Sequence, residues 1–202
     1  MKKYNIYLYV VLLIGCLGCS DFLDKQPDDM KTDEMVWSTR TQVEGYLANV
    51  YAAIPPHNLH QDDPWLGCSD ECDLSWTVYN TYGINLGNWS TNSYFYNKYA
   101  TWYKAIRASL TFENNVDRCG ELSADLKKQY KAEVKFLRGY YYWLLIRQYG
   151  PVVLITQQMP SSTDWTALAR SPFDDCVDYI CKMMDESAED LPLHWWNNTT
   201  NL

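Results

Sequence analysis

Rings and amides gather between residues 76 and 92, and they are the side chains of this sequence best suited to bind a ligand. A sugar is apolar on the faces of its ring and polar around its edge. It is therefore bound by flat side chains that stack on those faces and by short amides that reach its hydroxyls. We expect a saccharide site with the ligand-binding residues Trp76, Tyr79, Tyr82, Asn88 and Trp89. The alternative is that these rings pack their loop onto the scaffold.

Acidic residues next to this cluster raise a second possibility, a glycoside hydrolase. They are Asp62, Asp63, Asp70, Glu71 and Asp73. A glycosidase holds two carboxyl groups about 5–5.5 Å or about 6.5–9.5 Å apart across a cleft. Sequence spacing does not supply that separation, and a solvated acidic loop is the commoner explanation of such residues. We therefore expect no catalytic residues, and a binding protein rather than an enzyme.

Metal ions, cofactors and nucleic acid are not expected as ligands. Cys68 and Cys72 form a local pair without a second Cys or His pair at the spacing of a zinc site. Whether these two cysteines form a disulfide is left open by the sequence. The chain has no glycine-rich phosphate loop and no His-Glu-x-x-His helix. Its formal net charge of -8 leaves no basic surface to neutralise phosphates.

Four helices must position these residues. Apolar positions recur at helical spacing, and they predict helices over residues 38–53, 93–116, 123–150 and 171–191. The only candidate strand is the short apolar run at residues 152–155. The pattern predicts an all-α fold built as an array of helix pairs.

Capping residues and inward faces make the third and fourth helices the best defined. Ser123 is a predicted N-cap, and Gly150 followed by Pro151 ends the third helix. Ser171 is a predicted cap, with Pro172 at the first position of the fourth helix. The expected inward residues of that helix are Phe173, Val177, Ile180 and Met184. On the second helix, Tyr99, Trp102 and Tyr103 are expected in the core.

Two connections, residues 55–92 and 151–170, are much longer than the usual 4–6 residues or so. Connections of that length in a compact protein are usually functional or mobile. The first of them carries the Trp, Tyr and Asn cluster, which is why we place the ligand site there.

The N-terminus has the pattern of an exported lipoprotein. Residues 1–3 are a short basic start, and residues 4–17 are mostly apolar but too short to span a bilayer as a helix. The run ends with two Gly-Cys pairs, at Cys16 and Cys19, either of which could be a lipidated cysteine. We expect a signal peptide at residues 1–18 and a polar tether at 19–37, followed by the folded domain at 38–202.

Three stretches of the chain resemble the SusD/RagB family of Bacteroidetes surface lipoproteins. They are residues 19–27 (CSDFLDKQP), residues 132–151 (AEVKFLRGYYYWLLIRQYGP) and residues 170–173 (RSPF). The resemblance implies a tetratricopeptide-like helical scaffold, lipidated at Cys19 and anchored in the outer membrane facing the cell surface. It implies a non-catalytic protein that binds glycans or other nutrients and delivers them to a SusC-like, TonB-dependent transporter.

Length is where the chain departs from that family, whose members usually run to several hundred residues. We therefore expect residues 38–202 to be the N-terminal helical domain of a SusD-like protein whose C-terminal part is missing. The adjacent indoles of Trp195 and Trp196 would lie on a surface that this part covers. A helical-repeat interaction scaffold without ligand binding remains the third functional class.

Overall fold

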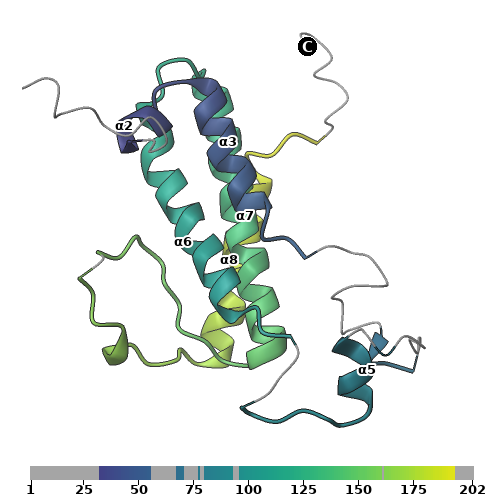
Figure 1. Cartoon of the computed structure of the whole chain (residues 1–202). Coiled ribbons are helices and arrows are strands. Elements are labelled where there is room, and N and C mark those ends of the chain that lie inside the picture. The colour runs from purple at the N-terminus through teal and green to yellow at the C-terminus, as the bar shows by residue number, and fades with distance from the viewer. Residues whose placement is uncertain are drawn as a thin grey trace, which may run out of the picture. The chain divides into compact units, whose positions relative to one another are not determined.

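The computed structural model of the chain describes residues 32–55, 67–70, 77, 80–92, 96–160 and 162–193. Cys16, Cys19, the expected signal peptide and most of the tether lie outside these ranges. In the part described, every regular element is a helix, so the all-α prediction is confirmed (Figure 1). The helices are α2 (Asp33–Val36), α3 (Arg40–Tyr51), α5 (Asn80–Asn85), α6 (Tyr99–Asn115), α7 (Ala124–Tyr149) and α8 (Phe173–Ala188). Short 3-10 turns cover Val116–Arg118 and Trp165–Ala167.

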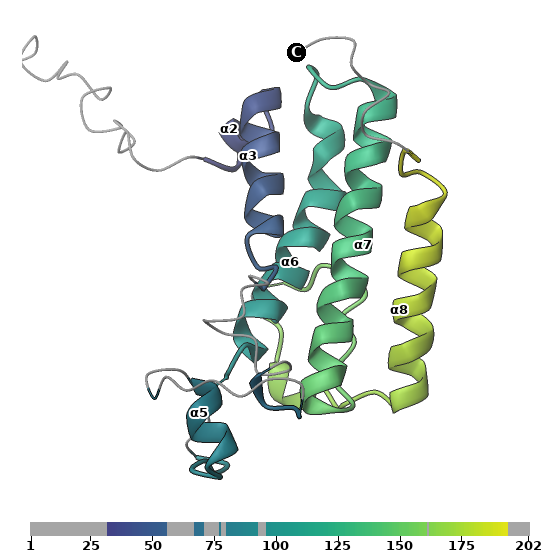
Figure 2. The same cartoon turned by 90° about the vertical axis from the view of Figure 1, so that its right-hand side faces the viewer.

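Helix α7 is the centre of the packing. It lies between α6 and α8, and α3 contacts both α6 and α7 (Figure 2). Successive helices run antiparallel (Figure 2). Arg138 of α7 pairs with Glu113 of α6, and Lys135 of α7 pairs with Glu186 of α8. This is the expected arrangement of helix pairs. No described helix is both long enough and apolar enough to cross a membrane.

The ends of α7 form as the sequence predicts. The Ser123 hydroxyl accepts a hydrogen bond from Leu126 N at 3.2 Å and so caps a backbone group that the helix leaves without a partner. At the other end, Gly150 has a φ of 68°, which a residue with a side chain rarely adopts. Its N–H donates to Ile146 O, and Pro151 cannot continue the helix.

The folded part begins before residue 38. Trp37, which we assigned to the tether, is only 2% exposed and packs against the rings of Tyr46 and Phe112. A large ring seated between α3 and α6 belongs to the core, so the boundary lies N-terminal to Trp37. The α3 prediction itself is confirmed, with Val43 and Val50 fully buried.

Helix α6 begins at Tyr99, later than the expected start at residue 93. Several polar groups of residues 96–98 have partners outside a helical hydrogen-bond pattern. The Tyr96 carbonyl accepts from the Gln148 amide, and Lys98 N donates to the Tyr149 hydroxyl. The Asn97 side chain accepts from Tyr99 N at 3.3 Å. Residues 96–98 are thus held in a non-helical approach to α6.

The inward face of α8 is rotated from the one we expected. Ile180 is buried as predicted, but Phe173 is 47% exposed and Val177 and Met184 are only half-buried, while Cys176 and Met183 are buried. Gly139 of α7 is the physical reason. A Cβ atom there would lie 3.3 Å from Met183 Cβ, so the missing side chain lets this face of α8 approach α7 closely. The cap also differs: Pro172 is the N-cap, and the Ser171 side chain makes no capping bond.

The other residues of α8 that we expected to face inward, Val177 and Met184, border an open groove on α7. Tyr140 and Trp143 stack there with ring centroids 5.6 Å apart, and Arg147 covers the Trp143 ring. Trp143 is 38% exposed. The groove is lined by Tyr140, Trp143, Ile146, Val177, Ile180, Cys181 and Met184.

The apolar run at residues 152–155 is extended but does not form a strand, which corrects our one strand candidate. Side chains replace the missing neighbour strand. The Tyr103 hydroxyl donates to Val153 O at 2.8 Å. The Tyr142 hydroxyl accepts from Ile155 N at 2.7 Å and donates to Ile155 O at 3.2 Å. Since two phenols satisfy these backbone groups, the run needs no sheet.

Replacing Tyr142 by Phe should lower the free energy of unfolding by about 1–3 kcal/mol. The ring would stay, but both backbone groups of Ile155 would lose their partner, which costs more than a simple exchange of bonds with water. Urea unfolding followed by helical circular dichroism measures the change.

Tyr140→Phe is the matched control for this variant. The Tyr140 hydroxyl makes no hydrogen bond within the described part of the chain, so its removal should change stability by less than about 0.5 kcal/mol. Equal stability of the two variants would show that the Tyr142 hydroxyl does not hold the segment.

Candidate functional site

Helix α5 positions the described part of the predicted saccharide site. It ends in a Schellman motif, in which Asn88 N donates to Gly83 O and Gly87 N donates to Ile84 O. The motif needs a residue with positive φ, and Gly87 supplies it with a φ of 67°. The helix therefore ends before Gly87, and Asn88 and Trp89 are the first residues after this turn.

Of the five predicted ligand-binding residues, three are described. Trp89 is 58% exposed, Asn88 is exposed and Tyr82 is half-buried. Trp76 and Tyr79 lie outside the described residues. The structure thus exposes the Trp89 indole next to the Asn88 amide. The convergence of all five side chains on one site stays a prediction.

A neighbouring amide has a structural role instead. The Asn85 side chain donates to Gly67 O at 2.8 Å, and the Cys68 thiol lies 4.0 Å from Thr81 O. These contacts hold residues 67–70 against α5. Because Asn85 stabilises this substructure, it is not offered as a ligand-binding residue.

The alternatives that rested on the same loop are only partly placed. Asp70 is exposed, while Asp62, Asp63, Glu71 and Asp73 lie outside the described residues. Cys72 also lies outside the described residues, so a disulfide between Cys68 and Cys72 is not tested. No pair of carboxyl groups at a glycosidase separation can be assembled from the part of the loop that is described.

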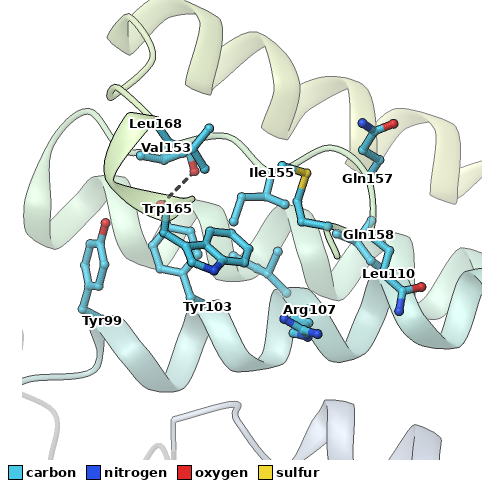
Figure 3. Close-up of a pocket in the computed structure, with 12 residues that line it drawn as sticks. Tyr99, Tyr103, Arg107, Leu110, Val153, Ile155, Gln157, Gln158, Trp165 and Leu168 are labelled. Carbon is cyan, nitrogen blue, oxygen red and sulfur yellow. Dashed lines mark hydrogen bonds between the residues drawn. The ribbon is translucent and has the colours of Figure 1, made fainter. Parts of the chain in front are cut away.

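A pocket of about 330 Å³ lies elsewhere, between α6 and the connection after α7 (Figure 3). Helix α6 forms its floor, and residues from 153–159 and 165–168 form the opposite wall. Trp165, on the 3-10 turn of that connection, reaches across towards α6 and is 43% exposed. The lining residues are Tyr99, Tyr103, Ile106, Arg107, Leu110, Val153, Ile155, Gln157, Gln158, Met159, Trp165 and Leu168.

The phenol of Tyr103 fastens the two walls of this pocket together. Its hydroxyl donates to Val153 O, drawn as the dashed line in Figure 3. Burial raises the pKa of Tyr103 well above its ordinary value, so the phenol keeps the proton that it donates. At one end of the pocket, the Gln158 amide oxygen accepts from Asn114 of α6 at 3.2 Å. The segment is therefore bonded to α6 at two places.

Sequence reasoning missed this pocket. It placed Tyr99, Trp102 and Tyr103 together in the core, and only Trp102 is fully buried. The other two rings pack against each other, with centroids 4.7 Å apart, and face the pocket. The signal that could have pointed to it was the length of the connection at residues 151–170.

Comparison with known proteins assigns the family. The SusD-like family described as starch-binding and associating with the outer membrane matches residues 21–201, nearly the whole chain. The protein belongs to this family of SusD-like proteins. It is similar to a SusD-like protein of Formosa agariphila, with 25% identity over 171 residues that cover 79% of this chain and 32% of the relative. A second SusD-like protein of that organism is 23% identical, over 95% of this chain and 39% of its own.

Solved structures share the fold. A SusD-like protein from Bacteroides fragilis superposes with a TM-score of 0.64 and 22% identity, over 87% of this chain and 34% of its own. A laminarin-binding SusD-like protein superposes with a TM-score of 0.61 and 14% identity, over 80% of this chain and 37% of its own. The chain thus spans about a third of the length of the proteins that it matches.

Proposed function

We propose that this protein is a non-catalytic lipoprotein of the cell surface that binds glycans and delivers them to a SusC-like, TonB-dependent transporter. In this proposal, lipidation of Cys19 anchors it in the outer membrane, and Trp76, Tyr79, Tyr82, Asn88 and Trp89 bind the saccharide. Family membership supports the class of activity, since the family description joins starch binding to the outer membrane.

The exposed indole of Trp89 is the observation that carries the proposed site. Burying an apolar ring normally stabilises a protein, so a tryptophan that is 58% exposed is available to a ligand. The hydrogen bonds of the Schellman motif fix the backbone just before it. The backbone that carries the indole therefore needs little further ordering when the ring stacks on a pyranose.

We expect Trp89→Ala to weaken glycan binding by roughly tenfold, as the loss of one exposed aromatic anchor does in other interfaces. Titration calorimetry with maltohexaose and laminarihexaose measures the affinity, because the family description and one structural neighbour name glucans of these two kinds. The helical circular dichroism should stay unchanged.

Leu86→Ala is the matched control for this experiment. Leu86 lies three residues before Trp89, is apolar and is 65% exposed, but it has no flat ring to stack on a sugar. It should leave the affinity unchanged. If Trp89→Ala binds as tightly as the parent chain, or if Leu86→Ala weakens binding equally, the site is not at Trp89.

A further inference from the structure

We propose that the pocket between α6 and the connection after α7 is a second binding site, which takes a small ligand with a flat apolar body and a carboxylate, such as an aromatic acid. The proposal does not rest on the saccharide site at Trp89. It rests on the lining of the pocket, on one arginine and on the way in which the wall is held.

The body of the ligand follows from the lining. Aliphatic side chains from both walls line the pocket, among them Ile106 and Leu110 of α6 and Ile155 and Leu168 of the connection. The indole of Trp165 lies over them with almost half of its surface exposed (Figure 3). A pocket of about 330 Å³ is at the small end of the range for ligand sites, so it suits one or two fused rings better than a chain of sugars.

The charge of the ligand follows from Arg107. This exposed residue rises from α6 at the pocket, and within the described ranges its guanidinium makes no hydrogen bond or ion pair. The acidic residue next to the opposite wall, Asp164, does not neutralise Arg107 in the described structure. Its carboxylate accepts hydrogen bonds from Thr166 N and Thr166 Oγ1, at 3.0 and 2.6 Å. An arginine fork that has no partner among the described residues and lies beside an apolar pocket is suited to a ligand carboxylate, which it can bind through two parallel hydrogen bonds.

The wall of the pocket is already in place without a ligand. Tyr103 and Tyr142 hold residues 153–155 by three hydrogen bonds, and Asn114 bonds to Gln158. A ligand therefore does not need to order this segment in order to bind, which lowers the entropic cost of binding.

Binding of 2-naphthoate to the chain tests the proposal, with 2-naphthamide as a neutral ligand of the same shape and glucuronate as a carboxylate without an apolar body. Titration calorimetry should show the naphthoate binding at least about tenfold more tightly than either of the others, as one charge-assisted pair and one apolar body predict. Arg107→Gln should weaken naphthoate binding by about tenfold and leave naphthamide unaffected, and Arg107→Lys should recover part of the loss.

Control variants separate this site from the rest of the surface. Arg147→Gln removes the same charge from α7, where it covers Trp143, and should leave naphthoate binding unchanged. Trp89→Ala should also leave it unchanged, so failure of the saccharide site and failure of this one are distinguishable. Absence of naphthoate binding, equal affinity for naphthamide, tighter binding of glucuronate or an unaffected Arg107→Gln variant would each overturn the proposal.

Discussion

The Trp102→Ala variant is expected to lose about 3–5 kcal/mol of stability, the usual cost of removing a large ring from a packed core. Trp102 is 1% exposed, and its indole lies edge-on to the rings of Tyr96 and Tyr149, at 6.3 and 6.5 Å. It therefore joins the start of α6 to the end of α7. The variant would leave a cavity that the rigid helices around it cannot close. Urea unfolding followed by circular dichroism measures the loss.

Trp89→Ala is the control for this prediction, because it removes the same side chain from an exposed position. Its effect on stability should lie within about 0.5 kcal/mol. The two tryptophans then report opposite properties: Trp102 affects unfolding, and Trp89 affects binding. Similar unfolding midpoints for both variants would show that Trp102 is not part of the core.

The second large effect is expected at the buried ion pair of α7 and α6. Arg138→Ala should lower the free energy of unfolding by about 2–4 kcal/mol, since it removes a charge that Glu113 needs. The Arg138 side chain is 4% exposed and lies 2.7 Å from the Glu113 carboxylate. The Glu113 side chain is 27% exposed, so water can solvate part of its charge, which keeps the expected cost below that of a fully buried pair.

Replacing both partners distinguishes the charge from the packing. The double variant Arg138→Met with Glu113→Gln fills the same space without ions, and it should recover most of the stability lost in Arg138→Ala. The measurement is again urea unfolding, at neutral pH. If the double variant is as unstable as the single one, the loss comes from packing around Arg138, for instance against Met183, and not from the unpaired carboxylate.

The helices could be predicted from the sequence because their ends depend on local chemistry. Ser123 and Gly150 mark the limits of α7 through bonds to neighbours in sequence. The errors arose where distant residues decide the structure. The face of α8 follows from close contact between Gly139 and Met183, and the start of α6 follows from bonds to Gln148 and Tyr149. The spacing of apolar residues within one helix carries no information about such contacts between helices.

The two candidate sites differ in the same way. Trp89 and Asn88 stand out in the sequence because their residue types suit sugars, and the structure leaves both exposed. The pocket needs two segments more than forty residues apart, so no local pattern reveals it. In the sequence, Arg107 is an ordinary exposed arginine of a helix. Only the structure shows that it lines the same pocket as Trp165.

The wall of the pocket also has a dynamic consequence. Residues 153–155 are held by the hydroxyls of Tyr103 and Tyr142 and not by a neighbouring strand. Breaking these bonds, together with the one between Asn114 and Gln158, frees the segment while the helices stay wound, so its opening does not require global unfolding. The lifetime of a molecule trapped beneath the segment would then be set by these side-chain hydrogen bonds, and not by the unwinding of a helix.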